Sequence, residues 1–183
     1  MELILVGYPG SQCIVAASKY LTNKYLPFEF NISYVNYKGD INKWAAFVSG
    51  YLSALKDKNI VFALDDYLIA SFIDMQKYKS ALNEIGGDVV CVKLCNSTQE
   101  EHIEYPVTTQ YCIWNRQYLI ELLGQVNTPW EFEMRGSKIF DKEVLLIPCL
   151  EYFTNSSISS RWEGIKLEGL KDEDINYIKQ NLL

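Results

Sequence analysis

A short, almost wholly apolar run at residues 2–7 (ELILVG) constrains the fold most, because it ends abruptly at Gly7, Pro9 and Gly10. A continuous apolar run of this length, bounded by turn residues, is typical of a strand buried on both faces of a sheet. Residues 13–26 then carry apolar side chains at helical spacing. A buried strand followed at once by a helix predicts the start of an α/β fold.

The same alternation of strand and helix continues through the next segments. Residues 30–37 alternate well enough for a second strand, and the segment at 59–70 (NIVFALDDYLIA) holds a third, buried strand that runs straight into two aspartates. Between them, residues 41–57 predict a helix that Asp40 can cap. One face of this helix would hold Trp44, Phe47, Val48, Tyr51 and Leu55. Three strands with two intervening helices predict a right-handed unit with a mainly parallel sheet flanked by helices.

The rest of the chain is less regular but continues the α/β pattern. We expect a helix at 73–87, a strand at 88–95, a polar loop at 96–104, a strand leading into a helix over 105–126, a turn-rich segment at 127–140, a strand at 142–153, a loop or edge strand at 155–164 and a final helix at 172–183. That helix carries Ile175, Ile178 and Leu182 but no candidate catalytic group. We therefore expect its loss to affect stability more than chemistry.

Charge and cysteine usage exclude several classes of protein. The chain of 183 residues has 17 basic and 23 acidic residues, a net charge of -6, which argues against a general nucleic-acid binder. No apolar run approaches the roughly 20 residues that a membrane-spanning helix needs. The widely spaced cysteines suggest buried free thiols and therefore a cytoplasmic protein; they are Cys13, Cys91, Cys95, Cys112 and Cys149.

Asp65 and Asp66 are the strongest chemical signal, since they end the third predicted strand. Ligands of open α/β sheets bind at the carboxyl ends of strands. Carboxylate oxygens there suit Mg²⁺ or Mn²⁺, which would bridge to a substrate diphosphate. The alternative is structural: Asp66 would cap the next helix, and Asp65 would pair with a lysine.

Two further segments could contact a nucleotide. The turn after the first strand contains Gly7, Tyr8 and Pro9. Backbone amides in this turn could bind an anion, although a tight turn between strand and helix explains the segment equally well. Arg161, beside Trp162, could hold a phosphate or simply pack on the tryptophan ring. The single histidine, His102, lies in an acidic stretch, which argues against hydrolases that need a catalytic histidine.

Glu131 and Glu133 are candidates for a general base. They lie in the segment TPWEFEMRGS, where Trp130 and Phe132 could desolvate a carboxylate and raise its pKa. The alternative is a solvated loop anchored by the tryptophan.

The order of these elements resembles a family of small bacterial and phage glycosyltransferases that use sugar nucleotides and have a GT-A-like fold. The resemblance spans residues 1 to about 168 and is most specific at VFALDDYLIA, IWNRQYL and PWEFE. It implies that Asp66 and Asp65 hold a metal ion on the donor diphosphate and that Glu133, or else Glu131, deprotonates the acceptor. The chain departs from the family pattern in having adjacent aspartates rather than a spaced pair, and WEFE where the family has tryptophan-glycine before its acidic residues.

The resemblance implies a single domain over residues 1–183: a nucleotide-sugar-binding half at 1–95, an acceptor and catalytic half at 96–170, and a C-terminal helix at 171–183. The expected reaction moves a sugar from a nucleoside-diphosphate-sugar to a hydroxyl on a glycan, lipid or modified base. A second subunit could complete the acceptor site. The alternative is a non-catalytic binding module that retains the fold. In an enzyme, Asp65, Asp66 and one of the two glutamates should converge within about 10 Å.

Overall fold

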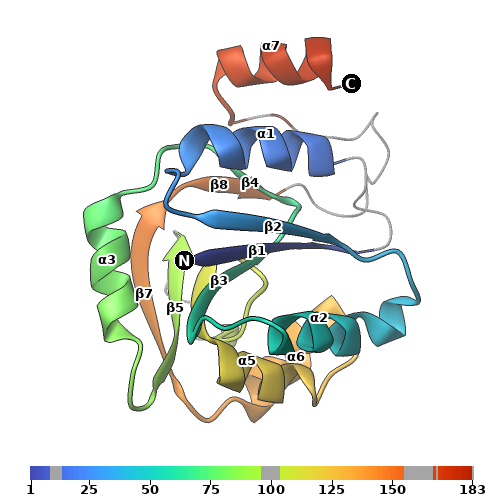
Figure 1. Cartoon of the computed structure of the whole chain (residues 1–183), viewed down its shortest axis with the longest axis vertical. Helices are drawn as coiled ribbons and strands as arrows, with labels where there is room; N and C mark the ends of the chain where they lie inside the picture. Colours follow the sequence, from blue (N-terminus) through green and yellow to red (C-terminus); the bar gives the residue numbers. More distant parts are fainter. Residues whose placement is uncertain (9–13, 96–103, 155–166, 168, 183) are drawn as a thin grey trace.

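The structure is a computed structural model, and it describes residues 1–8, 14–95, 104–154, 167 and 169–182. A six-stranded sheet has the order β2-β1-β3-β6-β5-β7 (Figure 1). Its strands are β1 (Glu2–Gly7), β2 (Asn31–Asn36), β3 (Asn59–Leu64), β5 (Val89–Cys95), β6 (Cys112–Asn115) and β7 (Glu143–Leu150). A second sheet pairs β4 (Tyr67–Ile69) with β8 (Tyr152–Thr154). The helices are α1 (Val15–Tyr25), the 3₁₀ helix η1 (Ile41–Lys43), α2 (Trp44–Ser53), α3 (Met75–Glu84), α5 (Arg116–Leu123), α6 (Pro129–Ile139) and α7 (Asp172–Asn181).

The expectation of a mainly parallel sheet flanked by helices is confirmed. β1 pairs in parallel with β2 and β3, and β5 pairs in parallel with β7. β6 is the reversed strand of this sheet: it runs antiparallel to both of its neighbours, β3 and β5. The start of β6 therefore lies at the edge of the sheet where β1 and β3 end.

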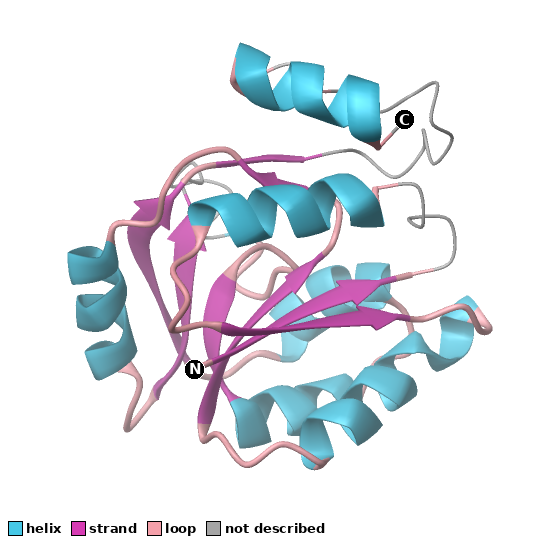
Figure 2. Ribbon diagram, turned by 45° about the horizontal axis from the view of Figure 1, so that its top comes forward, coloured by secondary structure: helices cyan, strands magenta, loops and turns pink. Residues whose placement is uncertain are grey.

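Helices cover the sheet on both sides (Figures 1 and 2). α1 lies on one face with α7 outside it, whereas α2, α5 and α6 lie on the other, and α3 flanks β5 and β7. An aromatic cluster fixes the α2 and α6 side: the ring centroids of Phe132 lie 6.2 Å from Phe62 and 6.0 Å from Trp114. Because burying such a side chain contributes about 1.5–3 kcal/mol, this contact anchors α6 firmly below the sheet.

The helix predicted at 41–57 forms, but the apolar face differs in part from the expected one. Asp40 caps η1 by accepting a hydrogen bond from the Asn42 amide at 3.0 Å. The buried residues of α2 are Trp44, Ala45, Val48 and Leu52, whereas Phe47 is 42% exposed. Phe47 instead packs its ring against Tyr37, with the centroids 4.7 Å apart. The helical period of the apolar residues is as predicted, but the buried face of the helix is rotated by one position from the predicted face.

The prediction of a turn-rich segment at 127–140 is wrong, because most of it is the helix α6. Thr128 caps this helix by accepting a hydrogen bond from the Glu131 amide at 3.1 Å, and Pro129 takes the first helical position. This Thr-Pro start is a normal helix signal. The glycine within the segment made this helix signal harder to recognise. Gly136 is buried against Val107, where an added Cβ would lie 3.2 Å from a valine methyl.

Candidate functional site

Asp65 and Asp66 form the turn between β3 and β4, at the carboxyl end of a central strand. Their side chains are 2% and 6% exposed, so two carboxyl groups are nearly withdrawn from solvent. The Asp65 amide donates to the carbonyl of Val6 on β1 at 3.2 Å. The predicted position at the end of the third strand is thus the observed one, and β1 ends beside it.

Tyr8 connects this turn to helix α6. Its hydroxyl donates to Oδ2 of Asp66 at 3.1 Å. Its ring lies edge-on to Trp130, with centroids 6.0 Å apart and planes at 72°. Trp130 is 51% exposed, whereas Tyr8 is buried. The end of β1, the acidic turn and the first turn of α6 therefore meet at one place.

Glu133 lies one turn further along α6 and is held by two threonines. Its Oε1 accepts hydrogen bonds from the Thr109 amide at 2.8 Å, the Thr109 hydroxyl at 2.6 Å and the Thr108 hydroxyl at 3.3 Å. The Thr109 carbonyl in turn accepts from the Leu64 amide at 2.9 Å, directly before Asp65. Glu133 is therefore tied to the end of β3.

The electrostatics of Asp66 are unusual for an aspartate. Burial raises its pKa to about 7, and the nearby charge of Glu133 adds to the rise, while the hydrogen bond from Tyr8 opposes it. Its Oδ1 is buried and has no hydrogen-bond partner within the described part of the chain. A buried carboxylate with an unsatisfied oxygen is costly unless a cation or donor approaches it.

The donor atoms present fit a hard divalent cation. Carboxylate oxygens are what Mg²⁺ and Mn²⁺ prefer, and Mg²⁺ is commonly held by one or two carboxylates, with substrate phosphates and water completing the shell. Asp66 and Asp65 could supply the protein ligands. Over residues 1–8, 14–95, 104–154, 167 and 169–182, no group of three or more histidine, cysteine or acidic residues is arranged to hold a metal by itself.

Glu131 has a structural role in the described geometry. Its Oε2 accepts from the backbone amide of Asn127 at 2.8 Å and from the Asn127 side chain at 3.1 Å, just before α6 begins. Gly7 ends β1 as expected. Pro9, His102 and Arg161 lie outside the described residues.

Sequence reasoning missed Thr108, Thr109 and Tyr67. The Tyr67 hydroxyl lies 3.3 Å from the Thr109 hydroxyl, and both side chains are buried. The available signal was a pair of adjacent threonines shortly before β6, but only the antiparallel direction of β6 places them beside Glu133.

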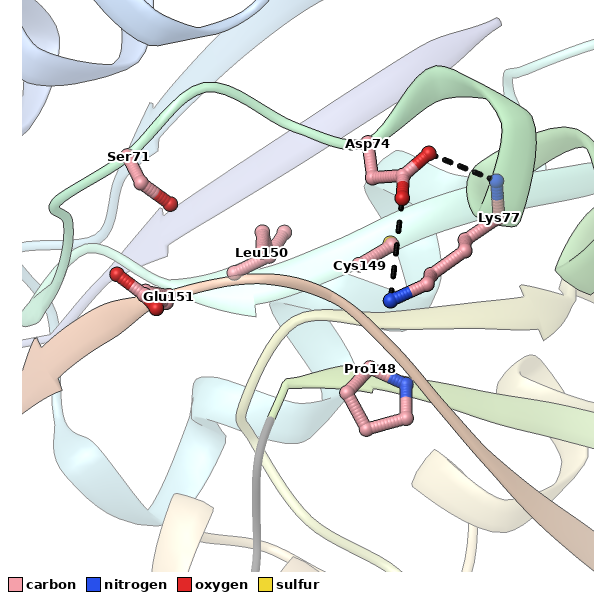
Figure 3. Close-up of a pocket in the computed structure, with 7 residues that line it drawn as sticks. All are labelled: Ser71, Asp74, Lys77, Pro148, Cys149, Leu150 and Glu151. Atoms are coloured by element: carbon pink, nitrogen blue, oxygen red, sulfur yellow. Dashed lines mark hydrogen bonds and ion pairs between the residues drawn. The ribbon is translucent and has the colours of Figure 1, made fainter.

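Two surface cavities lie away from these residues. One, of about 540 Å³, lies between α1 and α7. The other, of about 210 Å³, lies beside the start of α3 (Figure 3) and is lined by Ser71, Asp74, Lys77, Pro148, Cys149, Leu150 and Glu151. Its Asp74 caps α3 and approaches Lys77 at 3.8 Å, and burial raises the pKa of Cys149 to about 12. The Cys149 thiol therefore stays protonated near neutral pH, and Asp74 is engaged as the cap of α3.

Comparison with known proteins shows what kind of fold presents this arrangement. No protein-family model matches the chain, and no curated protein matches it in sequence. Solved structures do match, and they include nucleotidyltransferases and glycosyltransferases. Their identities of 7–13% show a shared fold and nothing finer.

Three of these structures are informative. A 4-diphosphocytidyl-2C-methyl-D-erythritol synthase from Anaerococcus prevotii has a TM-score of 0.51 at 10% identity, over 100% of this chain and 98% of that one. A cytidylyltransferase from Leptospira borgpetersenii has a TM-score of 0.50 at 13% identity, over 98% and 93%. A glycosyltransferase involved in glycosylation of the major capsid of PBCV-1 has a TM-score of 0.50 at 7% identity, over 87% and 97%.

None of the helices in the described segments combines the length and the apolar character needed to cross a bilayer.

Proposed function

We propose that the protein is a glycosyltransferase that moves a sugar from a nucleoside-diphosphate-sugar to a hydroxyl acceptor. The observation that carries the proposal is the meeting of Asp66 and Glu133 at the carboxyl end of β3. Tyr8 bridges Asp66 to the start of α6, and Thr109 bridges Glu133 to the end of β3. Two carboxyl groups in one place can divide the work between binding the donor and accepting a proton.

The donor side of the site would be built on β1 and β3. Asp66, assisted by Asp65, would hold Mg²⁺ or Mn²⁺, which when bound neutralises the diphosphate as it leaves. The backbone near Gly7 and Pro9, the side chain of Tyr8, and Arg161 would contact the nucleotide. The buried and unsatisfied Oδ1 of Asp66 supports this role.

The acceptor side would be built on α6. Glu133 accepts the proton of the acceptor hydroxyl while that oxygen forms a bond to the anomeric carbon. The bond from the anomeric carbon to the diphosphate breaks, and the diphosphate departs with the electron pair. The acceptor is a hydroxyl on a glycan, lipid or modified base, and a second copy of the chain could complete its binding site. General-base assistance of this kind contributes about 10²–10⁴-fold to the rate.

A binding module without catalysis is the alternative from a different class. It would need no acid–base pair, so the contacts that bring Asp66 and Glu133 together favour the enzyme. One of the similar structures is a cytidylyltransferase. Transfer of a nucleotidyl group requires cationic groups around the phosphates. Residues 7–13 (GYPGSQC) supply no lysine or arginine, which favours glycosyl transfer over nucleotidyl transfer.

The compartment we propose is the cytoplasm. Cys91, Cys95, Cys112 and Cys149 are buried free thiols, and such thiols persist in a reducing environment.

The first experiment is a thermal-shift screen of the full chain against UDP-, GDP-, CMP- and dTDP-sugars, each with and without Mn²⁺. A ligand at 100 times its dissociation constant adds about 2.7 kcal/mol to stability. We expect one nucleotide class to stabilise the protein more with Mn²⁺ than with EDTA. The same screen with CTP tests the nucleotidyltransferase alternative, and stabilisation by CTP alone would contradict the proposal.

The second experiment measures turnover with the donor that the screen identifies. Glu133→Gln keeps the shape and removes the charge, so kcat should fall at least about 100-fold while donor affinity is retained. Glu131→Gln is the matched control on the same helix and should lose far less. If neither variant loses more than about threefold, general-base catalysis by this helix is wrong.

A further inference from the structure

The hydrogen bonds around Glu133 are distributed unequally between its two carboxylate oxygens. Oε1 accepts three: two from Thr109, through its amide and its hydroxyl, and one from the hydroxyl of Thr108. Across the described segments, Oε2 accepts none from the protein. An oxygen that already accepts three donors cannot take up a proton without losing at least one of them. The two oxygens are therefore chemically different.

The threonine hydroxyls are themselves held in one direction. A hydroxyl has one proton to donate. Since Thr109 gives its proton to Glu133 at 2.6 Å, its oxygen must accept from the Tyr67 hydroxyl at 3.3 Å. Burial, with the charge of Glu133, raises the pKa of Tyr67 well above its ordinary value, so the phenol stays protonated and can donate. The oxygen of Thr108 likewise accepts from the Gln110 amide at 3.3 Å.

The backbone that carries the two threonines is fixed as well. The Thr109 carbonyl accepts from the Leu64 amide on β3. On the other side, Ser137 of α6 accepts from the Val107 amide at 3.1 Å and donates to the Val107 carbonyl at 3.1 Å. The segment before β6 is thus held both to β3, which leads into Asp65, and to the helix that carries Glu133.

We infer that Thr109 is a positioning residue that dedicates Oε1 of Glu133 to the scaffold and leaves Oε2 as the atom that accepts the acceptor's proton. This inference rests on the proposed function for its catalytic consequence, but the difference between the two oxygens exists without turnover. Thr109 itself touches no reacting atom. Its hydroxyl sets the orientation of the carboxylate plane, and Tyr67 sets the orientation of the hydroxyl.

The test uses three variants of the full chain. Thr109→Val keeps the volume and the amide donor but removes the hydroxyl, whereas Thr109→Ser keeps the hydroxyl. Thr22→Val is the matched control, because Thr22 is a fully buried threonine of α1. Each variant is first checked for folding by circular dichroism and thermal melting.

The first readout is independent of activity. With carboxyl-¹³C glutamate incorporated, the resonance of Glu133 is assigned by its disappearance in Glu133→Gln and compared between variants at one fixed pH. The chemical shift of a carboxyl carbon depends on the hydrogen bonds that its oxygens accept. The Glu133 resonance should therefore move in Thr109→Val, return towards its wild-type position in Thr109→Ser and stay in place in Thr22→Val. An unchanged Glu133 resonance in folded Thr109→Val overturns the inference.

The second readout is kinetic. Thr109→Val should lower kcat about 10- to 100-fold with little change in the KM for the donor, and Thr109→Ser should restore most of it. An active wild type with equal kcat in Thr109→Val also overturns the inference. A wild-type protein that neither transfers nor hydrolyses any donor, yet shows the displaced Glu133 resonance in Thr109→Val, would count against the proposed function and support the positioning of Glu133.

Discussion

Asp174 is a buried carboxylate in the contact between α7 and α1, and its replacement gives a sharp prediction. Asp174 is fully buried, and it accepts hydrogen bonds from Lys24 Nζ at 2.7 Å, from the Tyr20 hydroxyl at 2.9 Å and from the Tyr25 hydroxyl. All three donors belong to α1. Breaking a buried charged pair typically costs about 3–5 kcal/mol. Because Lys24 is 27% exposed and can regain water, we expect Asp174→Ala to cost about 3 kcal/mol, at the low end of that range.

The assay is thermal and urea unfolding, with hydrogen exchange of the α7 amides as a second readout. For a chain of this size, about 3 kcal/mol corresponds to a fall in Tm of roughly 6–12 °C. Hydrogen exchange separates local release of α7 from global unfolding. A double-mutant cycle with Lys24→Met should give a coupling of at least about 1 kcal/mol. A fall in Tm below about 2 °C, with unchanged exchange in α7, would refute the reasoning.

The same carboxylate gives a pH dependence with a definite sign. Burial alone would raise the pKa of Asp174, but the hydrogen bonds from Lys24, Tyr25 and Tyr20 outweigh it and lower the pKa below its ordinary value. Its contribution to stability is therefore present above the pKa of an unfolded aspartate and is lost as the pH falls through the lowered value. Asp174→Ala should lose this acid-sensitive part of the stability curve.

Asp66 should behave in the opposite way: because its pKa is raised to about 7, its contribution to stability is present below pH 4 and lost as the pH rises through 7. Asp66→Asn should therefore raise Tm at pH 8 in EDTA and change Tm little at pH 4. The same substitution should weaken donor binding in Mn²⁺ but not in EDTA. Equal effects on donor binding in Mn²⁺ and in EDTA would exclude the metal role. Thr128→Ala removes the cap of α6 and should cost about 1 kcal/mol in urea unfolding. A chain ending at Gly169 should keep donor affinity in calorimetry although it is less stable, and a folded truncation that no longer binds the donor would contradict this.

The sequence predicted those elements whose local pattern agrees with their tertiary surroundings. β1, β3 and α1 are apolar in the period that their burial requires, and Asp65 and Asp66 could be placed because a strand end is visible in the sequence. α6 was not predicted, because its buried face is small and contains a glycine that packs against a neighbouring loop.

Other features depend on contacts between distant segments and leave no local signal. Asp174 looks like an ordinary acidic residue in the first turn of a polar helix, yet three donors about 150 positions earlier bury it. In the sequence, Thr108 and Thr109 look like part of a strand. Nothing in the sequence shows that β6 runs antiparallel to its neighbours, which is what brings these threonines to Glu133. Glu133 could be named as a candidate, but the threonines that hold it could not.

The reversed strand also decides when the site can come into existence. β6 fills the space between β3 and β5, so a chain that ends before residue 104 leaves both strands with an unpaired edge. On the ribosome, the acidic turn is made early, but the threonines and then α6 emerge some forty to seventy residues later. The site is completed only by pairings between segments far apart in the sequence, which form slowly. A measured glycosyl transfer would therefore report that the whole sheet has closed, and a fragment that lacks β6 should show none.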